Sequence, residues 1–168
     1  MIKNINFLFV TFFGVGTVRF APGTITSLIT TTFLFSLFHV INLSSIIILI
    51  ALLSIFFLSF FAVAYYIKHE SNKDPKEVVI DEVIGQSIPI YLYEIGHGVT
   101  KDFYENILFY FYIFILFRFF DIKKPFPVNY FDQKYKNSFG VIFDDVVAGF
   151  YVVITLIIFM VVKSKLFS

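Results

Sequence analysis

Two pairs of adjacent acids, Asp81-Glu82 and Asp144-Asp145, each directly precede an apolar run of the chain. A single acid at a helix start would cap the helix and interact favourably with its dipole. Two adjacent acids exceed what capping needs, because like charges about 4 Å apart repel by roughly 4 kcal/mol at an effective dielectric constant near 20. Capping stays an open interpretation for either pair alone. The presence of both pairs favours a shared cation site.

If the two pairs converge, their carboxylates must either raise their pKa values or hold a cation. Ligation by oxygen alone favours a hard ion, Mg²⁺ before Ca²⁺ or Mn²⁺. We therefore expect Mg²⁺ to be bound by Asp81, Glu82, Asp144 and Asp145, with Asp121 as a further catalytic carboxylate. The chain contains no Cys, which excludes disulfides, thiolate metal sites and a cysteine nucleophile.

A third cluster combines basic and acidic residues just before a proline. Arg118 and Asp121 are three residues apart and share a helix face, and Lys124 precedes Pro125, which stops a helix. One interpretation is a helix end at the membrane interface, with basic side chains that snorkel to water. The other is a phosphate clamp, in which a guanidinium fork and an ammonium group bind phosphate oxygens.

A fourth motif, Pro22-Gly23-Thr24, follows Arg19 and opens a long apolar run. Pro-Gly favours a turn. The free amides at the start of the following helix can bind an anion beside the Thr24 hydroxyl. The motif alone is not specific, but it adds Thr24 to the predicted phosphate-binding residues.

The elements that must position these residues are strongly apolar. Of the 168 residues 58% are hydrophobic and 15% charged, and the mean hydropathy is +0.86. Typical soluble domains carry roughly 25% charged residues, and a soluble domain of this size could not bury so much apolar surface. The composition predicts a single domain, residues 1–168, folded as an all-α polytopic membrane helical bundle.

Four ranges come near the roughly 20 residues that cross a bilayer: 24–41, 43–67, 103–120 and 146–162. A fifth range, 83–95, is ambiguous, because thirteen residues reach only about 20 Å and Pro89 interrupts it. It is either a short or re-entrant helix or an oblique crossing, so we expect four to five embedded helices. The longest polar connection is the predicted loop 121–145.

If the range 83–95 crosses, both acid pairs lie on one side of the membrane. The positive-inside rule makes that side cytoplasmic, because nine basic residues fall there and three fall opposite. The nine are Arg19, Lys68, Lys73, Lys76, Arg118, Lys123, Lys124, Lys134 and Lys136, and the three are Lys101, Lys163 and Lys165. No concentrated basic stripe indicates a nucleic-acid partner.

In order and spacing, four blocks of the chain closely resemble the phosphatidylglycerophosphatase A family. They are Ala21-Pro22-Gly23-Thr24, residues 79–83 with Gly85, residues 117–127, and residues 140–149. The resemblance implies a Mg²⁺-dependent phosphatase that hydrolyses phosphatidylglycerophosphate to phosphatidylglycerol and phosphate in phospholipid biosynthesis. It also implies an all-helical fold in the bacterial inner membrane, with a cytoplasmic active site.

Two positions depart from the family's usual pattern. Thr26 stands where the family usually has Gly, and Asn137-Ser138 replaces a usual glycine pair before Gly140. We expect both changes to alter loop backbone geometry near the phosphate site.

Two other functions compete with the phosphatase. A CDP-alcohol-type phospholipid transferase also uses Asp-bound metal, but its Asp-Gly-x-x-Ala-Arg signature is missing. A divalent-cation carrier would place acids in mid-span, whereas these acids stand at the ends of apolar runs. The nucleophile (water or an aspartate), the number of metal ions, the oligomeric state and the selectivity among lipid phosphates stay open.

Overall fold

The computed structural model describes residues 2–68, 75–97, 102–135 and 137–167, and these ranges contain helices and connections but no strand. The prediction of an all-α fold is therefore confirmed. The elements in chain order are α1 (Ile2–Val10), the 3₁₀ turn η1 (Val15–Thr17), α2 (Pro22–Phe35), the π-helical turn η2 (Ser36–Val40), α3 (Ser45–Lys68), α4 (Ile80–His97), α5 (Phe103–Lys123), α6 (Val128–Lys134) and α7 (Ser138–Phe167).

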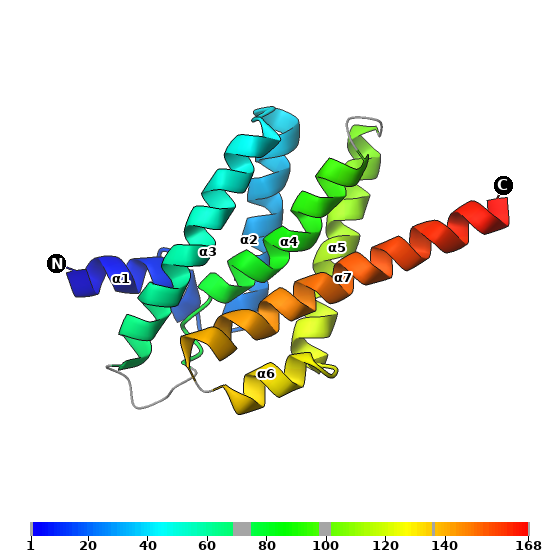
Figure 1. Ribbon diagram of the computed structural model, residues 1–168. Coiled ribbons are helices and arrows are strands. Elements are labelled where there is room, and N and C mark those ends of the chain that lie inside the picture. Colours follow the sequence, from blue (N-terminus) through cyan, green and yellow to red (C-terminus); the bar gives the residue numbers. More distant parts are fainter. Residues whose placement is uncertain (1, 69–74, 98–101, 136, 168) are drawn as a thin grey trace.

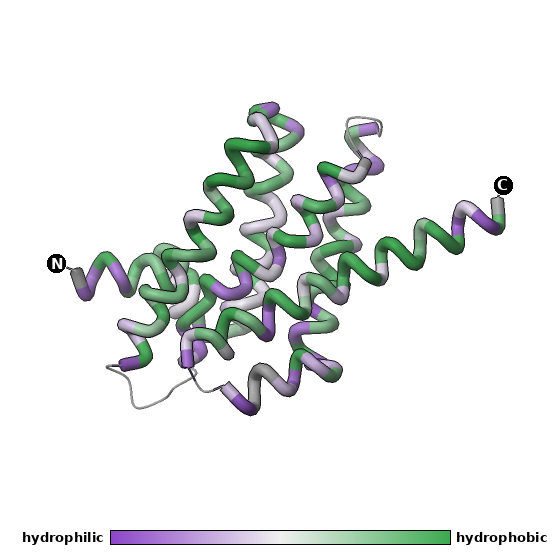
Figure 2. The backbone as a smooth tube through the Cα atoms, viewed as in Figure 1, coloured by the Kyte–Doolittle hydropathy of each residue, from purple (hydrophilic) through white to green (hydrophobic). Residues whose placement is uncertain are grey.

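Within the described ranges, four helical stretches are long and apolar enough to cross a membrane: Pro22–Val40, Ser45–Lys68, Phe103–Lys123 and Ser138–Leu166. Each overlaps a predicted range, which confirms the membrane helical bundle. Hydrophobic residues occupy nearly all of α3 and the C-terminal half of α7 (Figure 2). The 18-residue helix α4 is not among the four, so a crossing by residues 83–95 stays a prediction.

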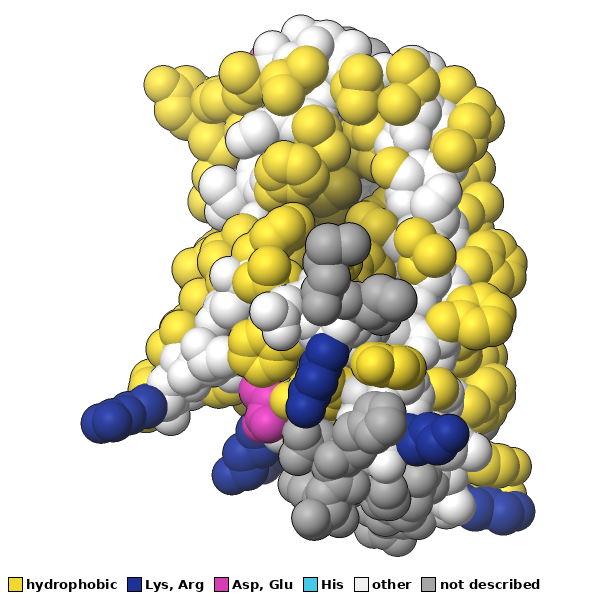
Figure 3. Space-filling view, turned by 90° about the vertical axis from the view of Figure 1, so that its left-hand side faces the viewer, with side chains coloured by type: hydrophobic (Ala, Val, Ile, Leu, Met, Phe, Trp, Pro, Cys, Tyr) yellow, Lys and Arg dark blue, Asp and Glu magenta, His cyan; other side chains and the backbone are white. Residues whose placement is uncertain are grey.

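Helices α2, α3, α4 and α5 stand side by side, and α7 crosses the bundle obliquely (Figure 1). Helices α2, α4 and α7 begin at the same end of the bundle, where α5 ends and α6 lies. On the face drawn in Figure 3, Lys, Arg, Asp and Glu side chains gather at this end, and hydrophobic side chains cover much of the rest. The topology therefore brings polar residues that are far apart in sequence to one end of an apolar bundle.

Two helix starts differ from the sequence prediction. Helix α7 begins at Ser138, so Asp144-Asp145 lies inside the helix rather than before it. Asn137 starts this helix, because its Oδ1 accepts a hydrogen bond from the Gly140 N–H at 3.1 Å. Helix α4 begins at Ile80, which places the other acid pair in its first turn.

The prediction of a long loop over residues 121–145 was wrong. Helix α5 continues to Lys123, and α6 and the start of α7 occupy most of the remainder. The expected changes of loop geometry were also misplaced, because Thr26 lies within α2 and Ser138 is the first residue of α7. Of the basic residues used to predict sidedness, Lys73, Lys101 and Lys136 lie outside the described residues.

Helix α4 passes through Pro89 without ending, contrary to the predicted interruption. Proline has no N–H, so the carbonyl of Gly85, four residues earlier, receives no helical hydrogen bond. At this point α7 approaches closely: a methyl group on Gly149 would lie 2.5 Å from the Gly85 carbonyl oxygen. Small residues allow such close approach between membrane helices. The Gly85–Gly149 crossing thus fixes the two helices that carry the acid pairs against each other.

Candidate active site

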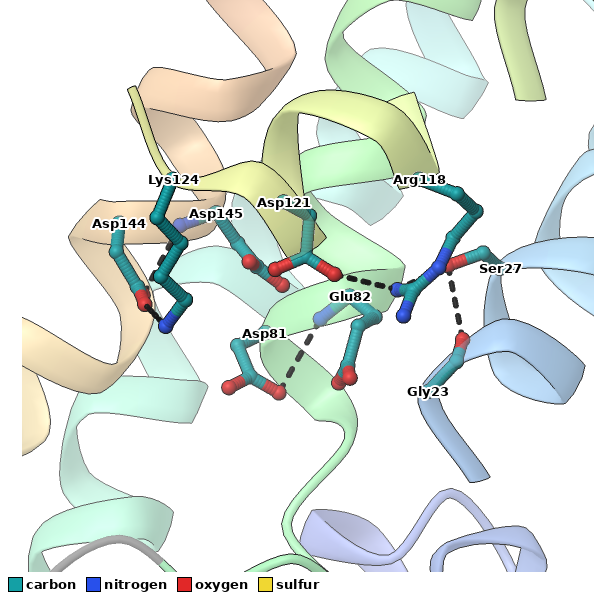
Figure 4. Close-up of polar contacts among 9 residues, drawn as sticks. All are labelled: Gly23, Ser27, Asp81, Glu82, Arg118, Asp121, Lys124, Asp144 and Asp145. Atoms are coloured by element: carbon teal, nitrogen blue, oxygen red, sulfur yellow. Dashed lines mark hydrogen bonds and ion pairs between the residues drawn. The ribbon is translucent and has the colours of Figure 1, made fainter. Parts of the chain in front are cut away.

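Three carboxylates from two helices form the centre of the site. Asp81 and Glu82 come from the first turn of α4, and Asp145 comes from the N-terminal part of α7. One carboxylate oxygen from each residue lies within 4.8 Å of the other two, and all three side chains point into the same space (Figure 4). Asp145 is only 3% exposed. Among the described residues, Glu82 Oε2 and Asp145 Oδ2 are buried without a hydrogen-bond partner.

This cluster is electrostatically unfavourable without a cation. Burial raises the pKa of the Asp81 carboxyl well above its usual value, and the charges of Glu82, Asp144 and Asp121 raise it further. Burial also raises the pKa of Glu82, although its hydrogen bond with Asp81 and the nearby Arg118 oppose the shift. A bound cation would relieve these repulsions and use the unpartnered oxygens. An all-oxygen donor set fits a hard divalent ion such as Mg²⁺.

Asp144 lies beside this cluster but is paired with a base. Its Oδ2 accepts a hydrogen bond from Lys124 Nζ at 2.8 Å, and the Asp144 side chain is 8% exposed. Lys124 caps the end of α5 in a left-handed conformation, with φ of 44°. A non-glycine residue in this conformation costs about 1–3 kcal/mol, a strain that is common at functional sites.

Arg118 is held by contacts on both sides. Its Nη1 lies 2.7 Å from Asp121 Oδ2 and donates to Ser27 Oγ at 3.3 Å. Ser27 Oγ in turn donates to the Gly23 carbonyl at 2.9 Å, so the first turn of α2 supports the guanidinium (Figure 4). Arg118 Nε is buried without a partner among the described residues. This N–H donor is therefore available to a bound anion.

Helix α2 contributes its start to the site. Pro22 occupies the first turn, a position that its missing N–H and fixed φ suit, and Ala21 before it is left-handed with φ of 45°. Gly23 packs directly against the Glu82 carboxylate, since a methyl group on Gly23 would lie 2.9 Å from the carboxyl carbon. Only a glycine leaves room for Glu82 here.

A pocket of about 350 Å³ joins these groups. All eight residues predicted from the sequence line it: Thr24, Asp81, Glu82, Arg118, Asp121, Lys124, Asp144 and Asp145. Their individual roles stay predictions. Sequence reasoning missed Gly23, Lys76, Tyr135 and Gly140 in the lining, and it missed Ser27 behind Arg118. Of these five residues, only Gly23 and Gly140 could have been found from the sequence, because they belong to the motif blocks that resemble the family.

Comparison with known proteins gives one family and two relatives. The model of the family "Phosphatidylglycerophosphatase A" matches residues 8–160. A phosphatidylglycerophosphatase A of Haemophilus influenzae is 63% identical over 41 residues, which cover 24% of this chain and 25% of the relative. A Bacteroides thetaiotaomicron protein named "Putative phosphatidylinositol-3-phosphatase" is 33% identical over 144 residues, 83% of each chain.

No solved structure matches the chain. The family match covers all eight site residues and most of the described helices, and it confirms the resemblance seen in the motif blocks. The chain belongs to the phosphatidylglycerophosphatase A family and is, by that membership, a lipid phosphatase of the phosphoric monoester hydrolase class.

Proposed function

We propose that this protein hydrolyses phosphatidylglycerophosphate to phosphatidylglycerol and inorganic phosphate, with Mg²⁺ held at the carboxylate cluster, in phospholipid biosynthesis. One observation carries the proposal. Three carboxylates from distant parts of the chain, Asp81, Glu82 and Asp145, have oxygens within 4.8 Å of one another. Arg118 and Lys124 line the same pocket. Cation ligands and phosphate-binding bases are the parts that phosphoryl-transfer sites combine.

The position of each residue in the pocket indicates its part in the proposed reaction. Asp81, Glu82 and Asp145 would hold the metal, and Asp144 stands next to them to complete the ligands or to orient Lys124. Bound Mg²⁺ would polarise a phosphoryl oxygen as a Lewis acid. Arg118 Nε and Lys124 Nζ would bind phosphate oxygens as negative charge spreads over them. Asp121 keeps the Arg118 fork oriented through its 2.7 Å ion pair.

The start of α2 completes the phosphate site in this proposal. Gly23 and Thr24 follow Pro22, so their backbone N–H groups lie in the first turn of a helix and have no helical acceptor. Such N–H groups bind anions, and the Thr24 side chain lines the pocket with them. The phosphate would then contact α2 and α5 together, opposite the carboxylates of α4 and α7.

The pocket's place in the fold suits a lipid substrate. It lies at the end of the bundle where the charged residues gather, next to the apolar helices that would face acyl chains. The lipid tails can stay in the bilayer while the phosphate enters at the boundary. The sequence analysis predicts an excess of basic residues on this side of the membrane, and by the positive-inside rule this excess supports a cytoplasmic active site in the bacterial inner membrane.

Phosphate release from phosphatidylglycerophosphate by the detergent-extracted protein, with and without Mg²⁺, tests this proposal. We expect release that requires Mg²⁺ and falls at least 100-fold in Asp81→Asn, Asp144→Asn and Lys124→Ala. Glu105→Gln, at the opposite end of α5, is the matched control and should keep full activity. Full activity in all three site variants would end the site assignment.

The Bacteroides relative's printed name makes phosphatidylinositol 3-phosphate the competing substrate. Parallel assays on the two lipids decide between them by kcat/KM. The two other functions have distinct outcomes. A transferase would release no phosphate without a nucleotide-activated lipid, and a cation carrier would move metal into sealed vesicles without phosphate release.

A further inference from the structure

A layer of buried polar groups lies beyond the active site, between α2 and α4. Gln86 on α4 is 0% exposed, and neither of its amide atoms has a hydrogen-bond partner among the described residues. Thr26 and Thr30 on α2 are 0% and 3% exposed, and their hydroxyl oxygens are also unpartnered in the described part of the chain. Burying an amide without a hydrogen-bond partner is unfavourable, because the amide loses its hydrogen bonds with water. Buried polar groups without partners are rare in native structures and call for an explanation.

Helical geometry places this layer directly behind Glu82. Helices α2 and α4 pack together, and both begin at the active-site end and run in the same direction. Gly23 of α2 meets Glu82 of α4 at their starts. One turn further along, Thr26 and Gln86 occupy the corresponding positions, and Thr30 follows one turn later. Residues four apart on a helix are neighbours, so Gln86 and Glu82 face the same side of α4, although the Gln86 amide and the Glu82 carboxylate are not hydrogen-bonded to each other in this structure.

Glu82 and Gln86 offer complementary groups. Glu82 Oε2 is a buried acceptor without a partner, and Gln86 Nε2 is a buried donor without one. A glutamine amide can donate two hydrogen bonds and accept two, so one N–H can serve Glu82 while the threonine hydroxyls of α2 serve the remaining amide groups. A carboxylate that binds a metal through one oxygen is commonly fixed by a hydrogen bond to the other.

We propose that Gln86 is a positioning residue: when a cation binds, the Gln86 amide turns to donate a hydrogen bond to Glu82 Oε2 and so holds Glu82 in its cation-binding orientation. Thr26 and Thr30 support the amide from α2. The role of the cation in this proposal rests on the proposed function. Gln86 would not touch the substrate, so its effect must appear first in cation affinity.

Calorimetric titration of Mg²⁺ into the detergent-extracted protein, without any substrate, tests the proposal. Gln86→Met removes the amide and keeps the side chain's size, and we expect it to weaken Mg²⁺ binding about 10–100-fold, as loss of an outer hydrogen-bond partner usually does. Thermal unfolding in EDTA should show equal or higher stability, because an unpaired polar group has left the core. A purely structural glutamine would change stability and leave cation affinity unaltered.

Gln86→Asn keeps the amide but withdraws it by one methylene, so it should also weaken binding, and it covers the case in which the methionine variant fails to fold. Unchanged Mg²⁺ affinity in a folded Gln86 variant would overturn the proposal, as would a parent protein that binds no Mg²⁺. Phosphate release by the parent separates this result from the proposed function. A parent that binds Mg²⁺ without hydrolysing the lipid refutes the phosphatase reaction and leaves the Gln86 comparison valid.

Discussion

Replacing Gly23 by alanine should damage the site without damaging the fold. The new methyl carbon would overlap Glu82 Oε1 and lie 2.9 Å from the carboxyl carbon of Glu82, whereas carbon atoms in contact are normally about 3.5–4.0 Å apart. The carboxylate must therefore move by at least about 1 Å. It is the far end of a flexible side chain, so the movement is cheap for folding, and alanine favours a helix over glycine by about 1 kcal/mol.

A displacement of about 1 Å at a catalytic group can lower the rate about 100-fold, which corresponds to about 2.7 kcal/mol in activation free energy. We expect kcat/KM for lipid phosphate release to fall by this factor in Gly23→Ala, with weaker Mg²⁺ binding and an unchanged or higher unfolding temperature. The assay is phosphate release under matched detergent conditions, together with thermal unfolding of each variant.

Two other glycines provide the comparison. Gly96→Ala, near the far end of α4, adds a methyl group that meets no atom of the described residues within 4 Å, so it should leave activity unchanged and stability unchanged or slightly higher. Gly85→Ala would place a methyl group 2.6 Å from the Asp145 carbonyl oxygen and 2.7 Å from the Phe117 ring. The α7 backbone cannot move away easily at this crossing, so the free energy of unfolding of this variant should be lower by about 1–3 kcal/mol. Wild-type activity in Gly23→Ala would show that the Glu82 position does not matter to the reaction.

Two further predictions concern charge. Lys124→Ala should destabilise the protein by about 1–2 kcal/mol, because it removes the ion pair of the buried Asp144 while Lys124 itself is 30% exposed. The double variant with Asp144→Asn should recover most of that loss in thermal unfolding, and an equally unstable double variant would contradict the pairing. In EDTA, the free energy of unfolding should fall as pH rises from about 3.8, the ordinary pKa of Asp, through the raised pKa of Asp81, because this carboxyl loses its proton at lower pH in the unfolded chain than in the folded one. Thermal unfolding from pH 4 to 8 should show this fall. The fall should be smaller in Asp81→Asn, and Mg²⁺ should suppress it.

The membrane helices could be predicted because their signal is local and long. An apolar run near 20 residues has few alternatives to a spanning helix, and the ranges 43–67 and 103–120 nearly coincide with α3 and α5. Helix ends were harder, because polar residues at a helix start look like a loop when hydropathy alone is considered. The two turns before Val146 carry Ser138 and an acid pair, and these belong to α7, which Asn137 immediately precedes.

The sequence also predicted residues that line the pocket, but it did not predict how these residues pair with one another. Consecutive residues on a helix point about 100° apart, so Asp144 and Asp145 cannot both face the same point equally. With the helix start unknown, the sequence cannot say which one joins Asp81 and Glu82. The structure directs Asp145 to the cluster and Asp144 to Lys124. The role of Gly23 was hidden for a similar reason, since its close neighbour is 59 positions away in the chain.

In the proposed metal site, the arrangement of helix ends would make cation binding and fold stability depend on each other. Asp81 and Glu82 sit in the first turn of α4, where the helix dipole favours negative charge, but Asp145 lies within α7 and has no such support. Each pair of carboxylates about 4 Å apart repels by roughly 4 kcal/mol at an effective dielectric constant near 20. The glycine crossing of α4 and α7 prevents the helices from separating to relieve this repulsion. Repulsion and burial both favour the protonated carboxyls, so in the proposed site cation binding and protonation would compete for the same oxygens.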